Sequence, residues 1–201
     1  MQQRFVVDAS GFSRFNPGPR APVWWGILGL ILVEASVVAG FVASYFYLLL
    51  MAPQWPPPGV EPPPLLWPSI TVLLLLASCL TMWWGSKAII NERYRQFVWA
   101  MFSSVGLACL VLVLRWQQFQ AMTVRWDDHA YGSIVWTIMG FHFIHVVSAA
   151  LGTSVVGILG IMRYFTPYRQ IGVIVDTMYW NFVGLVWIPF YILLCWVPRW
   201  L

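Results

Sequence analysis

Residues 24–50 read WWGILGLILVEASVVAGFVASYFYLLL, and Glu34 is the one charged residue in this stretch. A helix needs ~20 mainly apolar residues to span the hydrocarbon core of a bilayer. Four further runs meet this requirement, at residues 65–88, 97–119, 133–162 and 171–197. The sequence therefore predicts an all-α integral membrane protein, a bundle of five transmembrane helices.

The amino-acid composition agrees with this class. Hydrophobic residues make up 60% of the chain and charged residues 9%, whereas a soluble domain carries about 25% charged residues. Membrane topology and anionic lipid headgroups account for the net charge of +4. Nothing in the composition calls for a nucleic-acid partner.

The positions of the Lys and Arg residues predict the orientation of the chain. Eight of the 11 fall in the N-terminal tail or in the second and fourth connections, namely Arg4, Arg14, Arg20, Lys87, Arg93, Arg95, Arg163 and Arg169. Positively charged residues mark the cytoplasmic side. We therefore expect a cytoplasmic tail over residues 1–23, a five-helix membrane domain over residues 24–201, and a periplasmic C-terminus.

The two connections on the opposite side differ in character. Seven prolines lie between residues 53 and 64, and because proline lacks the backbone N–H and fixes φ, this segment is predicted to be stiff and extended. It acts either as a spacer or as a docking surface for a partner. The other connection carries Arg125, Asp127, Asp128 and His129, which form either a metal site or, more commonly, a solvated loop.

Small residues recur four positions apart on the first and fourth predicted helices. The rows consist of Ala35, Ala39 and Ala43, of Ser36, Gly40 and Ser44, and of Ser148, Gly152 and Gly160, with Gly157 nearby. Small residues at this spacing let helix backbones approach closely. We expect these helices to pack against other helices, in this chain or in a partner.

Four polar side chains fall at one depth in the predicted bundle. Glu34 and Asn181 lie ~15 Å past the inner starts of their helices, and His142 and His145 lie ~14–18 Å below the outer start of theirs. All four are therefore near the middle of a hydrocarbon core that is ~30 Å thick. A charge at that depth costs at least ~2.5–3.5 kcal/mol. We expect a neutral Glu34 hydrogen-bonded to His142 or His145.

This polar layer has two interpretations. It is either a proton-active or lipid-headgroup-sensitive site, or an interhelical hydrogen bond that fixes helix packing. Bis-histidine haem ligation between spans needs one histidine on each of two helices, whereas both deep histidines share one helix. We therefore predict no catalytic residue and no haem or metal site in this chain. Asp176 and Arg115 are predicted to be boundary residues, with Arg115 snorkelling to the surface.

Three of the helices carry motifs in a recognisable order. The first has a membrane glutamate, then Ala-Gly and Tyr-Phe, at Glu34, Ala39, Gly40, Tyr45 and Phe46. The fourth has Gly-Ser and then Gly-Phe-His-x-x-His-Val, at Gly132, Ser133, Gly140, Phe141, His142, His145 and Val146. The fifth has Tyr179, Trp180, Phe182, Val183, Val186 and Trp187. This pattern resembles subunit III of the haem–copper terminal oxidases, in its short five-helix bacterial form.

The resemblance has departures. Asn181 stands where that family has histidine, and Gly184 stands where it has aspartate. At the end of the third helix, Arg115, Gln118 and Phe119 replace the usual Gln, Glu and Tyr. The chain thus lacks two carboxylates of the family pattern, which argues against any proton-antenna or outer-surface role that depends on those acids.

The resemblance implies a non-catalytic subunit of a terminal oxidase, in aerobic respiratory electron transport that couples oxygen reduction to proton pumping. Such a subunit packs on the catalytic subunit I, with subunit II in the same complex, in the bacterial inner membrane. It binds phospholipid between its helices and supports sustained turnover, while partner subunits hold the haems and copper.

Two other functions stay open from the sequence. One is an accessory subunit or assembly factor of a related nitric-oxide reductase, because the fold is shared with such proteins. The other is a stand-alone proton or small-solute transporter, which is disfavoured because no inverted repeat or pair of discontinuous helices is visible.

Overall fold

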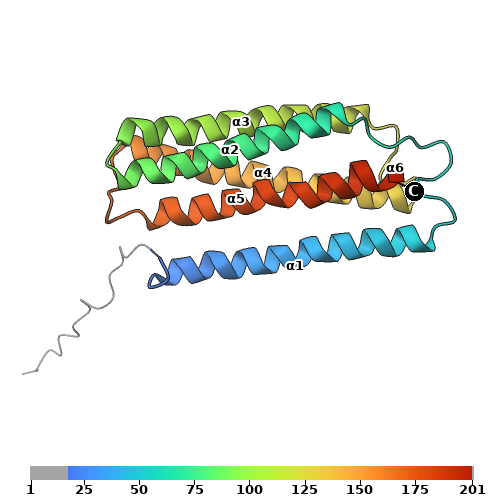
Figure 1. Cartoon of the computed structure of the whole chain (residues 1–201), viewed down its shortest axis with the longest axis horizontal. Helices are drawn as coiled ribbons and strands as arrows, with labels where there is room; N and C mark the ends of the chain where they lie inside the picture. The colour runs from blue at the N-terminus through green and yellow to red at the C-terminus, as the bar shows by residue number, and fades with distance from the viewer. Residues whose placement is uncertain (1–17, 201) are drawn as a thin grey trace, which may run out of the picture.

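The computed structural model describes residues 18–200, most of which lie in five long helices (Figure 1). These are α1 (Pro22–Met51), α2 (Leu66–Ile90), α3 (Tyr94–Ala121), α4 (Ala130–Ile161) and α5 (Ile171–Tyr191). Each is long and apolar enough to cross a bilayer, and residues 18–200 contain no strand. The predicted all-helical, five-span fold is confirmed.

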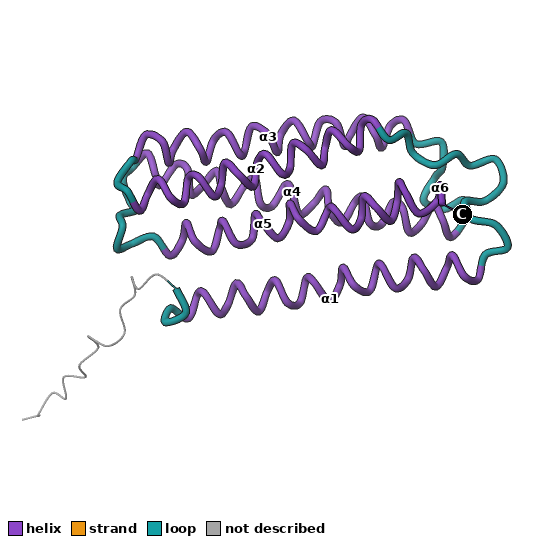
Figure 2. Tube along the Cα trace, in the orientation of Figure 1, coloured by secondary structure: helices purple, strands orange, loops and turns teal. Residues whose placement is uncertain are grey.

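The helices run side by side along the long axis of the molecule and alternate in direction (Figure 2). One end carries the connection between α1 and α2, the connection between α3 and α4, and the short C-terminal α6 (Val197–Trp200). We call it the proline-loop end, after the seven prolines between α1 and α2. Which end faces the cytoplasm stays a prediction, and residues 1–17 of the predicted tail lie outside the described residues.

The fifth span is interrupted near the proline-loop end. α5 passes into a π-helical turn, η1 (Ile192–Trp196), which leads directly into α6. Pro189 lies inside α5, where it cannot donate a backbone hydrogen bond and its ring crowds the preceding turn. A π turn accommodates such a disturbance without ending the helix. The span therefore reaches Trp200, slightly beyond the predicted 171–197.

The core of the bundle is formed by α2, α3, α4 and α5, which approach closely where one helix offers a glycine. A Cβ added at Gly85 would lie 2.4 Å from Met101 Cε, and one at Gly160 would lie 2.5 Å from Phe97 Cε1. Only glycine fits at such contacts, and this sets the spacing of the helices. Close packing of α4 through Gly160 was predicted, whereas nothing in the sequence singled out Gly85.

The small residues of α1 do not pack within this chain. Only Val38 and Tyr45 of its 30 residues are buried, and α1 lies at the edge of the bundle beside α5 and α4 (Figure 1). A Cβ at Gly40 would meet no atom within 4 Å. Ser36, Ala39, Gly40 and Ala43 are exposed and Ala35 is half-buried, and on α4 Ser148 and Gly152 are exposed as well. The sequence left open whether these rows pack within this chain or against a partner. For the exposed residues of α1, packing against a partner stays a prediction.

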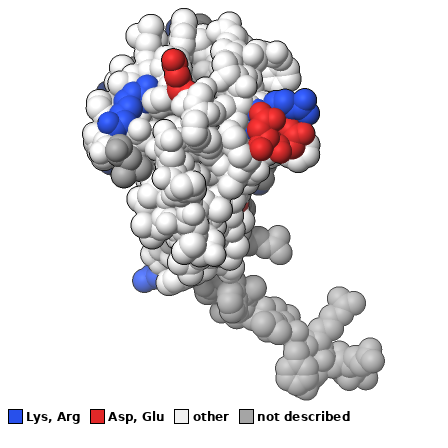
Figure 3. All heavy atoms as spheres, turned by 90° about the vertical axis from the view of Figure 1, so that its right-hand side faces the viewer, with Lys and Arg blue, Asp and Glu red and all other residues white. Residues whose placement is uncertain are grey.

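The proline-rich connection folds back over its end of the bundle. Trp55 is buried, donates from Nε1 to the Tyr45 hydroxyl at 2.9 Å, and stacks edge-on against Tyr131 with ring centroids 4.9 Å apart. Arg199 donates to the backbone carbonyl of Pro63. The segment is therefore anchored to α1, α4 and α6. Seen from this end, the surface is mostly uncharged, with charged side chains in a few small groups (Figure 3).

Gly160→Ala is expected to lower the thermal unfolding temperature of the purified chain, because the new methyl group overlaps the buried ring of Phe97. Overpacking of this kind costs about 1–3 kcal/mol. The control is Gly140→Ala on the same helix, where a Cβ meets nothing within 4 Å. Equal melting temperatures for the two variants would contradict the packing described here.

Candidate functional site

The predicted contact between Glu34 and a histidine is present, and the histidine is His145. Glu34 Oε2 of α1 lies 2.6 Å from His145 Nε2 of α4, with side-chain exposures of 16% and 17%. The oxygen lies outside the directional range of a hydrogen bond from that nitrogen. The pairing is thus confirmed as a close contact, although not as a well-aligned hydrogen bond.

The other ring nitrogen of His145 limits where its protons can be. Nδ1 lies 2.7 Å from the backbone carbonyl of Phe141, and since a carbonyl only accepts, Nδ1 carries a hydrogen. A neutral ring of this tautomer has a lone pair on Nε2, which would face the lone pairs of an ionised Glu34 at 2.6 Å. An ionised carboxylate facing this neutral tautomer is therefore an unfavourable combination.

His142 does not contact Glu34. Its Nε2 lies 3.1 Å from the backbone carbonyl of Val183 on α5, and its ring packs on Trp187 with centroids 4.6 Å apart. The side chain is 1% exposed, and Nδ1 has no partner. His142 thus ties α4 to α5, which matches the packing interpretation of the polar layer.

The fifth span carries two polar residues, Asn181 and Asp176, which differ in their contacts. Asn181 is half-buried, and the structure records no hydrogen bond from its side chain to Glu34, His142 or His145. Its predicted place in the layer is therefore one of depth only. Asp176 accepts from the buried hydroxyl of Thr153 at 2.9 and 3.1 Å and so joins α5 to α4, while its place at the membrane boundary stays a prediction.

The prediction that Arg115 snorkels to the surface is wrong. Its side chain is buried, with a relative exposure of 2%. Cζ lies 3.6 Å from the centroid of the Trp187 ring, and Nη1 donates to Gln118 Oε1 at 3.0 Å. The proline-rich connection and α6 cover the end of the bundle, so the guanidinium group cannot reach the surface.

Four of the aromatic residues that match the family pattern have a specific partner. The Tyr179 hydroxyl lies 3.3 Å from Ser148 Oγ, and Trp180 Nε1 donates to Ser78 Oγ at 3.0 Å. Tyr45 holds Trp55, and Trp187 lies between His142 and Arg115. These side chains connect separate parts of the fold, and sequence reasoning missed the partners because most of them come from distant segments of the chain.

The connection between α3 and α4 is a solvated loop that caps a helix. Arg125 pairs with Asp127 at 3.0 Å, and the backbone N–H of Arg125 donates to Asp128. His129 Nδ1 accepts from the backbone N–H of Gly132 at the start of α4. In the described part of the chain, no group of three or more His, Cys, Asp or Glu residues is arranged to hold a metal ion.

One departure from the family pattern has a packing reason. A Cβ added at Gly184 would lie 2.5 Å from Cys79 Sγ on α2. An aspartate at this position would therefore require Cys79, or the spacing of α2 and α5, to shift. The loss of that carboxylate goes together with the close approach of these two helices.

The fold and the buried polar layer define a multi-pass membrane protein. Its sequence matches the family model for cytochrome c oxidase subunit III over residues 12–199. Cytochrome c oxidase subunit 3 of Gallus gallus is 28% identical over 200 residues, 96% of this chain and 77% of that protein. The same subunit of Marchantia polymorpha is 29% identical over 178 residues, 84% of this chain and 67% of that protein.

The chain belongs to the cytochrome c oxidase subunit III family. It is thus a non-catalytic subunit of an oxidase complex that contains other subunits. The resemblance read from the helix motifs is confirmed.

A double-mutant cycle tests the Glu34–His145 contact. Glu34→Gln and His145→Phe are each expected to lower the free energy of unfolding, and their combination is expected to cost less than the sum, with a coupling of about 1 kcal/mol. Exposed ion pairs contribute little, so the cycle of Arg125→Gln with Asp127→Asn serves as the control. The control pair is expected to be close to additive. Strict additivity at the Glu34–His145 pair as well would show that these two residues do not interact.

Proposed function

We propose that this chain is subunit III of a haem–copper terminal oxidase in a bacterial inner membrane, with its N-terminus in the cytoplasm. It packs on the catalytic subunit I through the exposed face of α1, with subunit II in the same complex. It binds phospholipid between its helices and supports sustained turnover. The observation that carries the proposal is the small-residue face of α1, which is left uncovered by this chain.

Support for packing on subunit I comes from how weakly α1 is held by its own bundle. Two of its residues are buried, whereas eight are buried in α2 and seven in α3. Its outward face presents Ser36, Gly40 and Ala43. In a membrane, helices associate through close van der Waals contact at such small residues. A helix of subunit I that packs there would bury α1 on both sides.

Support for a role in turnover comes from the Glu34–His145 pair. It joins α1, the proposed docking helix, to α4. A carboxyl group and an imidazole in contact at this depth are suited to a proton-active or lipid-headgroup-sensitive role. His142 and His145 are each bonded within the bundle, so haem and copper are assigned to the partner subunits.

Gly40→Leu is expected to reduce by several-fold the amount of subunit I that co-purifies with a tagged copy of this chain, because leucine holds the partner helix away. The matched control is Gly106→Leu on α3, which is also exposed and has no neighbour within 4 Å of its Cβ position. The melting temperature of the isolated chain should not change in either variant. Equal recovery of subunit I from both would rule out α1 as the docking helix.

Glu34→Gln is expected to leave the haem absorbance of the assembled oxidase unchanged, since no haem is assigned to this chain. Oxygen consumption should start near the wild-type rate and decline faster over successive turnovers. Glu92→Gln, at an exposed residue between α2 and α3, is the control. Loss of haem absorbance in a fully assembled Glu34→Gln complex would contradict the proposal, and so would an unchanged time course.

A further inference from the structure

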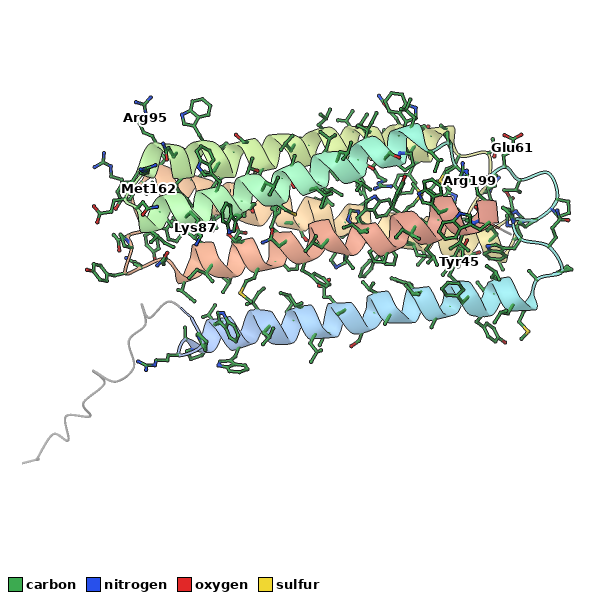
Figure 4. All side chains as sticks on the ribbon, viewed as in Figure 1. Tyr45, Glu61, Lys87, Arg95, Met162 and Arg199 are labelled. Atoms are coloured by element: carbon green, nitrogen blue, oxygen red, sulfur yellow. The ribbon has the colours of Figure 1, made fainter. Side chains whose placement is uncertain are left out.

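A second polar cluster lies away from the Glu34–His145 pair, around a cavity at the proline-loop end. The cavity has a volume of about 330 Å³. Its walls come from the proline-rich connection, the start of α2, the end of α3 and the connection that follows it, the first part of α4, and the α5–η1 segment. Glu61 and Arg199 mark this end of the bundle (Figure 4). Residues 60–64 of the proline-rich connection, which Trp55 and Arg199 anchor, form one side of the cavity.

Arg115 is the one cation that is buried in this wall. Only its Nη1 is bonded, to Gln118 Oε1, while Nε and Nη2 are buried and have no hydrogen-bond partner. Among residues 18–200, no carboxylate forms an ion pair with its guanidinium group. A buried charge is normally paired, and the ring of Trp187 compensates only part of that need. The charge of Arg115 is thus left without a counter-ion among the described residues.

The unpaired groups around the cavity are donors. The buried atoms without a partner include Gln118 Nε2, Tyr131 Oη and Trp187 Nε1, and all three residues line the cavity with Arg115. An amide nitrogen and an indole nitrogen donate only, and a tyrosine hydroxyl can donate. A ligand that satisfies this set must offer several acceptor oxygens.

The free atoms of Arg115 also specify a geometry. Nε–H and Nη2–H point in parallel from one edge of the guanidinium plane, and this fork matches two oxygens of a carboxylate or phosphate. We propose that the cavity binds an oxyanion of the phosphate class in the fork of Arg115, carried by a lipid headgroup or free in solution. Gln118, Tyr131 and Trp187 donate to its other oxygens.

The depth of Arg115 agrees with a lipid carrier. α3 has 28 residues and is ~42 Å long, so it extends ~6 Å beyond each face of a ~30 Å hydrocarbon core. Arg115 lies six residues before the end of α3, which places it ~3 Å inside that boundary. Apolar residues of the wall, among them Val135, Met139 and Leu194, suit the start of an acyl chain. The site does not depend on the proposed docking of α1.

The test uses the purified full chain in a neutral detergent, with dioleoylphosphatidylglycerol, dioleoylphosphatidylcholine and inorganic phosphate as probes. Native mass spectrometry and the shift in melting temperature report binding. Phosphatidylglycerol is expected to bind one per chain and to raise the melting temperature. Arg115→Gln should weaken this binding by about 10- to 100-fold, the range for a hydrogen bond to a charged group. Arg125→Gln, which removes an exposed cation at the same end, should not.

Two further variants keep the test decisive if Arg115→Gln folds poorly. Arg115→Lys keeps the charge but loses the fork, and Tyr131→Phe removes one donor, so both should weaken binding by a smaller factor. Saturation by inorganic phosphate alone, with the same dependence on Arg115, identifies a free anion as the ligand and supports the site. Failure of every probe to bind in an Arg115-dependent way overturns it. Anion binding that emerges only in Glu61→Gln also overturns it, since Glu61 is then the internal counter-ion.

Discussion

Polar groups inside a hydrocarbon layer must find partners within the protein, and the structure of this chain depends on that constraint. Water is absent there to replace a missing hydrogen bond. Glu34 meets His145 across α1 and α4, Asp176 meets Thr153 across α5 and α4, and Trp180 meets Ser78 across α5 and α2. Each contact joins two helices, so the same few polar atoms both satisfy the constraint and fix which helices are neighbours.

α1 is the exception to this internal arrangement. It joins its own bundle through Glu34, Val38 and Tyr45 and through the anchored Trp55, and it turns its small residues outward. A helix held at the edge in this way is suited to lie between two subunits. The membership of the chain in the subunit III family places it in an oxidase complex with other subunits, and the proposed contact with subunit I uses this surface.

The sequence predicted the fold and part of the site for identifiable reasons. Five apolar runs can only be spans, and counting residues along antiparallel helices placed Glu34 and His145 at one depth. Which histidine would face Glu34 depends on helix rotation. A span that is apolar on every side leaves this undetermined, and the same reason left the outward rotation of α1 unpredicted. Arg115 was misplaced because its burial results from the distant proline-rich connection folding over the end of α3.

The departures from the family pattern become physically connected in the structure. Gly184 lies where Cys79 of α2 comes close to α5, and Arg115 and Gln118 bond to each other.

The assignment to a haem–copper oxidase is tested most directly by a native purification through a tag on this chain. Iron, copper and the optical spectrum are measured before and after the subunits are separated. We expect a haem–copper core to co-purify and to keep all of its metal when this chain is removed. Haem or copper retained by the separated chain, or a partner that contains haem and non-haem iron without copper, would contradict it.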